Sequence, residues 1–599
     1  MDKIAITGMG AVSAAGDCCY EILKTIRNDL HGIESYNYFS TDLKDLPVGK
    51  AWVPDSSHVG VPGLEGKPVS RTTLMALYAL REAIYDGKVY EQKNVKDVPL
   101  RVVFVNATTV GGMDLTEKEF PLLREGGGNA GCMCSHDGGA TTKAIADCFG
   151  VFSEYTTVST ACSSAANALL ADAELLKSRQ ADIVIAGGTE ALTKFHICGF
   201  NSLMILDHEP CRPFDKNRNG LNLGEGAAYV VMEREETVKE VNDIIGELDH
   251  VSIVAYLTGY GNACDAFHQT ATSDNGEGPF LAMNEALRMA GLKPQQIDYV
   301  NAHGTGTLNN DLSESAALRR VFGDELSAVS STKGYTGHAT SAAGAVEAVI
   351  TLQALKDDFL PINRGWTEQG EGLISPVSGF PTYHPIEHAM CNSFGFGGND
   401  TSLIFSKHPV ENAEADDEEP RHEIKELARV EISGTEELPM VSEFVKPMEV
   451  RRMSRLMKAA VLSSMRALRE AGVESPDAII TATAYGAVEL SERLLNQLAD
   501  GEPLKPTWFM QSTHNTIAGE LAIRTRCHGY NITYTQGSQS LDWAMRDARR
   551  LIRQGRCKTV LVECHDETTP LFRNLMERAG RVCQQEEVKS IAIVLSCGE

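Results

Sequence analysis

The chain lacks the sequence features that mark membrane-spanning, secreted and disulfide-stabilised proteins. None of its 599 residues belongs to a run of about 18 consecutive apolar residues, and no basic segment followed by a long apolar core opens the chain. Its fifteen cysteines are scattered without a paired C-x-x-C spacing, which favours neither a disulfide framework nor a zinc site. We therefore expect a protein of the reducing cytoplasm.

Positive charge is scarce as well. The 55 lysines and arginines stand against 81 aspartates and glutamates, which gives a net formal charge of −26. Nucleic acids and anionic membranes require a basic face, so neither is expected as the main partner. The remaining composition, with 43% hydrophobic and 23% charged residues, is that of an ordinary globular protein of several domains.

Strand-like and helix-like segments alternate before residue 408. The clearest strands are Lys3–Thr7, Arg101–Asn106, Asp182–Ala186 and Tyr299–Asn301, and the clearest helices are Arg71–Ile84 and Gly278–Ala290. This alternation predicts a layered α/β core with largely parallel strand pairing.

A cysteine lies at the start of the most apolar helical segment. Val158–Lys177 begins with strand-forming and small residues and continues with alanine and leucine on almost every face. Such a helix is expected to be buried, with Cys162 at a tight strand-to-helix turn. Backbone N–H groups at a helix start favour thiolate, so we expect the pKa of Cys162 to be lowered from about 8.5, as in a nucleophile. The alternative is a small buried hydrophobic side chain.

Three glycine-rich motifs later in the chain help to decide whether Cys162 is a nucleophile or a small buried hydrophobic residue. His303 lies in NAHGTGT, His338 follows Lys333 in STKGYTGHATSAAG, and Phe396 lies in NSFGFGG. Each residue alone is typical of a structural, hydrogen-bonded position. Together with Cys162 they indicate a site where two neutral imidazoles hold a thioester carbonyl oxygen while charge develops on it. A cysteine protease fits less well, because no Asn or Asp orienting motif accompanies the histidines.

The end of the chain repeats its beginning. His408–Lys425 is acidic, contains two prolines and is typical of a linker. Beyond it, Asn531–Glu567 aligns without a gap with Tyr155–Ala191, and Ser538 then occupies the position of Cys162. This tail is predicted to be a copy of the first half without its nucleophile.

On these motifs, residues 1–408 resemble the elongating β-ketoacyl-acyl carrier protein synthases of the thiolase fold. The matching motifs, in family order and spacing, are VSTACSSAANA, CRPFDKNRNGLNLGEGA, NAHGTGT, Lys333–His338 with Gly344 and Glu347, and NSFGFGG. The resemblance implies an α/β fold, built as a five-layer αβαβα sandwich of two similar halves, with the tail as an additional half. It also implies a homodimer through the ketosynthase domain and a Cys-His-His site at the foot of a pantetheine tunnel.

The resemblance implies a role for each site residue. Cys162 would take an acyl chain from a carrier-protein thioester, while His303 and His338 would polarise the malonyl thioester and stabilise the enolate formed on loss of CO₂. Lys333 would support the site, with Glu347 as its charge partner.

Further roles concern the bound substrate. The backbone N–H groups of Cys162 and Phe396 would form the oxyanion hole, and Phe396 would be the gate that admits the second substrate. Thr305 and Thr307 would hydrogen-bond the pantetheine arm, and Gly395, Gly397 and Gly398 would form the substrate-binding turn and hinge of the gate.

The implied reaction is a decarboxylative Claisen condensation of acyl-Cys162 with malonyl-carrier protein in fatty acid, polyketide or polyene biosynthesis. No metal or redox cofactor is expected, because decarboxylation itself generates the carbanion. The substrates would be carried on the 4′-phosphopantetheine arm of acyl carrier protein, an acidic partner for which Lys67 and Lys216 are candidate basic contacts.

The predicted organisation has four segments. Residues 1–250 form the ketosynthase half with the nucleophile, 251–408 the half with the two histidines and the lysine, 409–425 the linker, and 426–599 the half without a nucleophile. The tail also resembles chain-length factors, so a structural, docking or chain-length role is expected for it. His514 and Asn515, which align near His136 and Asp137, are expected to be structural.

Two other functions stay open for the whole chain. One is a non-catalytic scaffold that binds carrier proteins and fixes chain length beside another synthase. The other is a coenzyme A-dependent thiolase, although Cys391 lacks the Cys-x-Gly context of that family's second cysteine. Departures from the ketosynthase pattern at Leu308, Gly334, Ser341 and Asn399–Asp400 concern pocket shape and chain-length preference rather than reacting atoms.

Overall fold

The computed structural model describes residues 3–36, 43, 45–53, 69–94, 99–245, 250–323, 326–411, 423–584 and 586–598. Lys67 and residues 412–422 of the predicted linker lie outside the described residues. In the ranges given, no helix is both long and apolar enough to cross a membrane.

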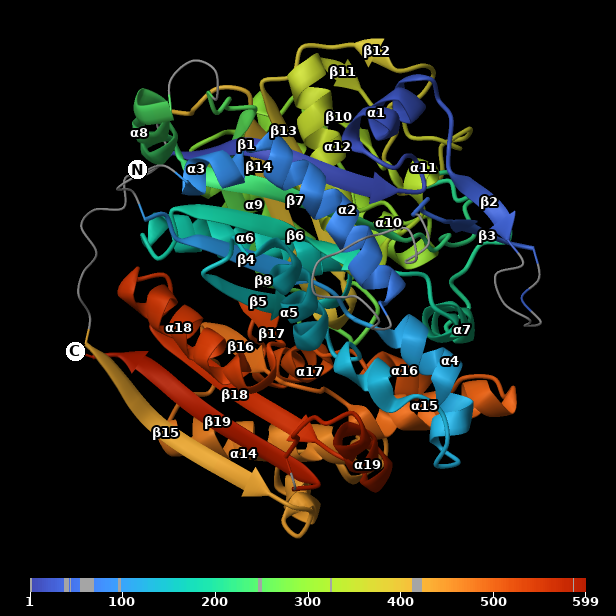
Figure 1. Cartoon of the computed structure of the whole chain (residues 1–599), viewed down its shortest axis with the longest axis vertical. Coiled ribbons are helices and arrows are strands. Elements are labelled where there is room, and N and C mark those ends of the chain that lie inside the picture. The colour runs from blue at the N-terminus through green and yellow to red at the C-terminus, as the bar shows by residue number, and fades with distance from the viewer. Residues whose placement is uncertain are drawn as a thin grey trace.

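Three groups of five strands form the framework (Figure 1). The first group contains β1 (Ile4–Ser13), β4 (Val102–Ala107), β5 (Glu154–Val158), β6 (Ile183–Glu190) and β7 (Gly226–Arg234). The second contains β8 (Ala255–Cys264), β9 (Tyr299–Asn301), β10 (Ala328–Ser330), β13 (His388–Gly395) and β14 (Asn399–Ser406). The third contains β15 (Ile424–Ser433), β16 (Ala478–Ala482), β17 (Asn531–Tyr534), β18 (Thr559–Glu567) and β19 (Val588–Cys597).

These strands form one hydrogen-bonded sheet in the order β10-β9-β13-β14-β8-β1-β7-β6-β4-β5-β17-β16-β18-β19-β15. Within each group the third, second, fourth, fifth and first strands lie side by side in that order. The predicted copy of the first half is therefore present, and its first strand begins at Ile424, just before the predicted boundary at residue 426. Two short ribbons, β2–β3 (Ile33–Tyr36, Leu46–Gly49) and β11–β12 (Phe359–Leu360, Thr382–Tyr383), lie outside this sheet.

The strand pairing is mixed, so the prediction of a largely parallel sheet is wrong. In every group the second strand pairs in parallel with the third and fourth, whereas the fifth pairs antiparallel with the fourth and first. Parallel neighbours need a long crossover, whereas a short connection forces antiparallel pairing. The turn at Phe396–Gly398 that joins β13 to β14 is such a connection.

Helices separate the strand groups into layers. α2 (Arg71–Asp86) and α5 (Gly138–Phe149) cover the outer face of the first group, and α9 (Glu277–Ala290) with α10 (Leu308–Phe322) covers that of the second. α6 (Ser164–Lys177) and α12 (Ala343–Asp357) lie between the two groups and contact strands of both. The predicted five-layer α/β sandwich is therefore confirmed.

The third group carries helices on both faces as well. α14 (Arg455–Ala471) and α17 (Thr516–Thr525) pack on one face, and α18 (Ser540–Arg553) packs on the other. The remaining helices are α1 (Cys19–Arg27), α3 (Val89–Lys93), α4 (Met113–Leu123), α7 (Lys194–Ser202), α8 (Glu235–Ile245), α11 (Lys333–Thr336), α13 (Pro447–Val450), α15 (Val488–Asp500), α16 (Pro506–Gln511) and α19 (Pro570–Arg578).

The core helices α6 and α18 occupy equivalent positions but differ in burial. Every residue of α6 from Ser164 to Leu176 is buried, since the helix lies between the first and second strand groups and is apolar almost all round. Over α18 the described part of the tail has no second strand group, and several of the helix's residues are exposed. The two sequences reflect this difference in burial, because α18 has arginines between its apolar residues whereas α6 is apolar on almost every face.

The tail joins the first group along the edge of β5. Val158 pairs with Tyr534, its own aligned equivalent, in an antiparallel bridge. The N–H of Ser159 donates to Thr533 O at 3.0 Å, and the N–H of Thr535 donates to Thr157 O at 2.9 Å. Because equivalent residues face one another, a local two-fold axis passes through this seam. The predicted homodimer would therefore need a surface other than the β5 edge, which this chain already fills.

Candidate active site

Cys162 lies at a sharp turn between β5 and α6. β5 ends at Val158, a 3₁₀ turn covers Ala161–Ser163, and α6 begins at Ser164. Ala161 has a φ of 54°, in the left-handed region that L residues rarely adopt, so strain is held immediately before the sulfur. The turn leaves Cys162 6% exposed at the start of the helix.

The predicted lowering of the Cys162 pKa is wrong. Burial raises the pKa of this thiol to about 12, and Lys333 and the backbone N–H of Phe396 offset that rise only in part. A buried thiolate loses its hydration, and this cost exceeds the stabilisation at the helix start. The resting site therefore holds a neutral thiol, whose proton must leave before the sulfur can attack.

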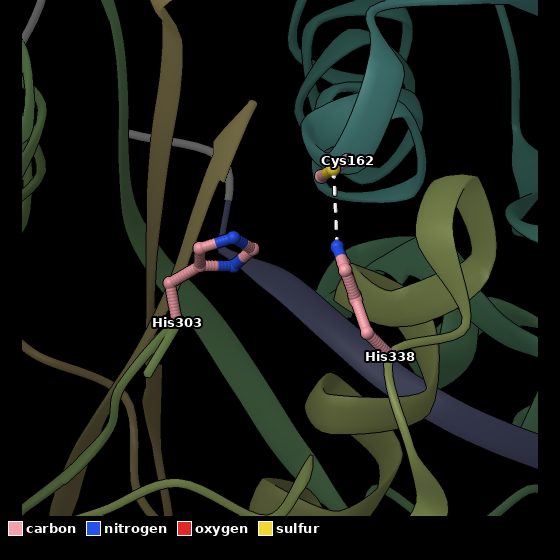
Figure 2. Close-up of side chains that lie close together, drawn as sticks. All are labelled: Cys162, His303 and His338. Carbon is pink, nitrogen blue, oxygen red and sulfur yellow. Dashed lines mark hydrogen bonds between the residues drawn. The ribbon is translucent and has the colours of Figure 1, made fainter. Parts of the chain in front are cut away.

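Two imidazoles from the second strand group face the sulfur (Figure 2). His338 Nε2 lies 3.1 Å from Cys162 Sγ, and the His303 and His338 ring centroids are 5.4 Å apart with nearly perpendicular planes. Burial, together with the charge of Lys333, holds the pKa of both histidines well below its ordinary value. Both rings are consequently neutral near pH 7.

The same three side chains offer a donor set for a metal ion. One donor atom each of Cys162, His303 and His338 lies within 4.8 Å of the others, and thiolate with imidazole suits Zn²⁺. The ammonium of Lys333, however, lies 3.4 Å from His303 Nδ1 and would repel a cation. The absence of a resident metal stays a prediction.

Lys333 is a buried ammonium that holds the loop of His303. Its Nζ donates to the backbone oxygen of His303 and to Glu347 Oε1, each at 2.5 Å. The carboxylate of Glu314 accepts the N–H groups of His303 and Gly304 at 2.8 and 2.7 Å. The His303 backbone is thus fixed from two sides, and Glu347 lies where a charge partner of Lys333 is expected.

Phe396 lies in the tight turn between β13 and β14. Its backbone N–H and that of Cys162 both face the sulfur and lower the thiol pKa. Gly397 has a φ of 83°, and a Cβ there would lie 2.7 Å from Asn515 Nδ2, so the position requires glycine. Asn515 Nδ2 in turn donates to Phe396 O at 2.8 Å. A residue of the tail therefore holds the turn that carries the Phe396 N–H.

The other residues predicted to contact substrate lie beside the site. The hydroxyls of Thr305 and Thr307 are 2.9 Å apart, in a loop whose N–H groups bond to Asp311. A Cβ at Gly395 or Gly398 would press on neighbouring chain, so both glycines permit close packing. Substrate contact by these residues stays a prediction.

An open cavity of about 900 Å³, counting its mouth, lies beside Cys162 between the first strand group and the tail. The residues before the linker that line it are Thr109, Val110, Met113, His136, Asp137, Gly138, Ala161, Cys162, Phe195, His196, Phe200, Thr340 and Phe396. The tail supplies Tyr485, Ser491, Phe509, Ser512, Thr513 and His514. Residues before the linker and residues of the tail are both needed to enclose this cavity.

The sequence did not reveal that tail residues reach this cavity. His514 lines it and places Nδ1 2.9 Å from Ser159 Oγ, and its burial lowers its pKa to about 4. Its alignment with His136, which also lines the cavity, was the available indication of this position. By contrast, Ser538, the counterpart of Cys162, is exposed at the start of α18.

The arrangement serves acyl transfer through a cysteine thioester, on a fold of the thiolase type. Family models narrow this class further. The N-terminal domain of β-ketoacyl synthases matches residues 1–238, its C-terminal domain matches 254–367, and a second N-terminal domain matches 426–597. The chain belongs to the β-ketoacyl synthase family, whose members are condensing acyltransferases.

Individual relatives agree with this assignment. The 3-oxoacyl-[acyl-carrier-protein] synthase 2 of Coxiella burnetii is 32% identical over 422 residues, which cover 68% of this chain and 98% of that protein. A ketosynthase in complex with its chain length factor from Xenorhabdus doucetiae has a TM-score of 0.57 and 26% identity, over 68% of this chain and 98% of that chain. The PfaC keto synthase-chain length factor is 16% identical, with a TM-score of 0.78 over 100% of this chain and 78% of its own. Because this last match covers the whole chain, it shows that the tail also has the fold of that protein.

Proposed function

We propose that the chain condenses an acyl group with a malonyl group, both delivered as thioesters of acyl carrier protein, to give 3-oxoacyl-carrier protein and CO₂. The observation that carries the proposal is the 3.1 Å approach of His338 Nε2 to Cys162 Sγ, with His303 beside them. The similarity to 3-oxoacyl-[acyl-carrier-protein] synthase 2 supports the choice of substrate class.

In the first step the acyl group moves to Cys162. The thiol proton passes to Nε2 of neutral His338, the sulfur attacks the thioester carbonyl, and the carrier thiolate leaves with that proton. Negative charge on the carbonyl oxygen is stabilised by the N–H groups of Cys162 and Phe396, because both already face the sulfur.

In the second step the carbon–carbon bond forms. The malonyl thioester oxygen accepts hydrogen bonds from the neutral rings of His303 and His338, the latter now in the tautomer that carries its proton on Nε2, so electrons released by loss of CO₂ are held as an enolate. The enolate carbon attacks acyl-Cys162, the carbon–sulfur bond breaks, and the sulfur regains one proton from solvent. Lys333, held by Glu347, positions His303, and burial together with the charge of Lys333 keeps the His303 ring neutral.

The carrier arm and its partner follow from the same proposal. Thr305 and Thr307 would bond the phosphopantetheine arm, Gly395, Gly397 and Gly398 would let Phe396 act as a gate, and no resident cofactor is needed. Lys216 is bonded to Glu368, so its charge is not free for the carrier protein. Cytoplasmic placement is supported by the free state of all fifteen cysteines.

We also propose that the tail is non-catalytic and completes the acyl pocket. The exposed Ser538, the tail residues in the cavity wall and the bond from Asn515 to Phe396 support this role. The chain length factors of related complexes are consistent with it. The domain limits at residues 250, 408 and 425 and a homodimer through another surface remain proposals.

The test is mass spectrometry of Cys162 after incubation with carrier-bound acyl groups, followed by malonyl-carrier protein. We expect an acyl adduct on Cys162 that disappears as 3-oxoacyl product and CO₂ form. Cys162→Ala should abolish both adduct and product, whereas Cys134→Ala, at an exposed thiol, should change neither. Product formation by Cys162→Ala would contradict the mechanism, and adduct without product in the wild type would favour the scaffold function.

A further inference from the structure

The outer face of α18 is basic, although the chain as a whole is acidic. Arg546, Arg549 and Arg553 are exposed and recur at helical spacing, so they lie on one side of the helix. The equivalent helix α6 is apolar on that side because a second strand group covers it. Since the tail has no such strand group over α18 among the described residues, its arginine face meets solvent.

These arginines line an open hollow at the junction of the two core helices. Arg546, Arg549, Arg550 and Arg553 form one wall, and Ser178 and Gln180, which follow the end of α6, form another. Asp542 and Met545 complete the rim. The hollow lies at the opposite end of α6 from Cys162, so it is separate from the cavity of the active site.

A narrow slot continues inward from this hollow. It shares Gln180, Arg546 and Arg550 with the hollow, and its volume is about 320 Å³ when the open space at its mouth is included. Its further lining residues are Val105, Thr156, Ala171, Leu175, Tyr534, Trp543 and Asp547. The wall is flat and aromatic, since Tyr534 stacks on Trp543 and the guanidinium of Arg546 lies 4.3 Å over the Trp543 ring.

Positive charge exceeds negative charge at the mouth, which is lined by Arg546, Arg549, Arg550, Arg553 and Asp542. Arg550 is bound to Glu174 and Asp547, and Arg546 pairs with Glu154 at 2.7 Å. Arg549 helps to lower the pKa of Glu426 without a direct ion pair among the described residues. Deeper in, the hydroxyl of Thr156 is buried and has no hydrogen-bond partner there. The cleft thus combines the guanidinium groups of Arg549 and Arg553 at its mouth with a slot that has aliphatic and aromatic walls and one unsatisfied polar atom.

We infer that this cleft binds a medium-chain aliphatic carboxylate. Guanidinium groups recognise a carboxylate through paired charge-assisted hydrogen bonds, which Arg549 and Arg553 can donate. The aliphatic chain enters the slot between Leu175 and Trp543, where it leaves water. The site lies at the junction of α6 and α18. It contains no nucleophile, so it binds its ligand without changing it chemically.

The test uses the full-length protein, the intrinsic fluorescence of Trp543, and octanoate as the probe. We expect a saturable fluorescence change that is absent in Trp543→Phe, and calorimetry with the same affinity. Arg549→Glu combined with Arg553→Glu should weaken octanoate binding at least tenfold. Arg451→Glu combined with Arg452→Glu, an equal charge change at exposed arginines away from the cleft, should leave it unchanged.

Three further probes decide the ligand chemistry. Acetate should bind at least tenfold more weakly than octanoate, because it cannot fill the slot, and octanol should bind more weakly because it lacks the charge. Equal binding of either, or tighter binding of octyl phosphate, would overturn the assignment to an aliphatic carboxylate. Ala171→Leu fills the slot and should reduce octanoate affinity while acetate binding stays the same.

Discussion

At the scale of single residues, Cys162 shows how burial can reverse an expectation drawn from chain position. A cysteine at a helix start is expected to ionise easily, but here desolvation raises its pKa to about 12. In the proposed mechanism the sulfur is thus unreactive until His338 removes its proton, which protects it between substrates. His338 is neutral because burial depresses its pKa, so its Nε2 has a lone pair for that proton, and the same low pKa favours release of the proton afterwards.

The alkylation rate of Cys162 by iodoacetamide should report this protonation state. With a pKa of about 12, roughly one thiol in 10,000 is ionised at pH 8, and the rate should rise about tenfold per pH unit from pH 6 to 10. The exposed thiol of Cys134 serves as the internal reference in the same digest. A plateau for Cys162 below pH 9 would mean that the helix start, and not burial, controls its ionisation.

At the scale of elements, the same sharp turn precedes each of the three core helices. Ala161, Thr340 and Gly537 have φ values of 54°, 45° and 57° just before α6, α12 and α18. Two of these residues are not glycine and therefore bear strain, and both line the cavity beside Cys162. In the tail, where the nucleophile is absent, glycine removes that strain.

The turn at Phe396 leads to a prediction about Asn515. Asn515→Ala removes the bond to Phe396 O, so the oxyanion-hole N–H should lose its alignment and acylation of Cys162 should slow about tenfold. Loss of an oxyanion-hole donor itself costs more, about 100- to 1,000-fold, because the donor is then absent. The measurement is single-turnover acylation followed by mass spectrometry.

Asn574→Ala, at an exposed asparagine of α19, is the control for this change. The pH profile of Cys162 alkylation separates lost alignment from misfolding. Lost alignment of the Phe396 N–H raises the thiol pKa further, so the rate falls at each pH but keeps its tenfold rise per pH unit, whereas misfolding exposes the thiol and gives a plateau. Acylation by Asn515→Ala at the wild-type rate would show that the turn holds its shape without the tail.

At the scale of the whole molecule, part of the architecture follows from sequence and part does not. The turn at Cys162, the α/β alternation and the gapless match of the tail could be predicted because short-range patterns encode them. The pairing of Val158 with Tyr534 and the bond from Asn515 to Phe396 could not, because they join segments hundreds of residues apart. The cavity was missed for the same reason, since its wall comes from both sides of the seam.

Glu174 anchors the tail to the first half across this seam. Its carboxylate accepts from Arg550, from Arg556 at 2.7 Å and from Tyr260 at 2.7 Å. Burial alone would raise the pKa of Glu174, but the two arginines hold it well below its ordinary value. Glu174→Gln should lower the free energy of unfolding by about 3 kcal/mol at pH 7, as measured by urea denaturation.

This stabilisation should depend on pH with a definite sign. A depressed folded-state pKa contributes stability above the unfolded value of about 4.3 and loses it as the pH falls below that. The difference between wild type and Glu174→Gln should therefore be constant from pH 6 to 8 and shrink below about pH 4. Glu470→Gln, at an exposed position on α14, should show neither effect, and an unchanged stability for Glu174→Gln would contradict the anchoring role.

Tyr485 lines both the active-site cavity and a second cavity beside it. The two share His136, Tyr485 and Ser491, and the second cavity is otherwise lined largely by apolar residues such as Phe120, Leu495 and Phe572. Tyr485→Ala should join them and shift the acyl groups trapped on Cys162 to longer chains, read by mass spectrometry of graded substrates. Tyr485→Phe keeps the ring and should leave the length distribution unchanged. A distribution unaffected by Tyr485→Ala would place the length limit elsewhere.

The pairing of β5 with β17 also bears on the stoichiometry of the proposed reaction. Each chain supplies both sides of its own two-fold seam yet carries the proposed nucleophile on only one side, since Ser538 takes the matching turn. In a symmetric pair of identical halves, each half would carry a reactive cysteine, and the two active sites would be coupled across the axis. This chain has one proposed reactive cysteine at the seam, and serine takes the equivalent position on the other side. Two active sites therefore cannot cooperate or alternate across the β5–β17 seam.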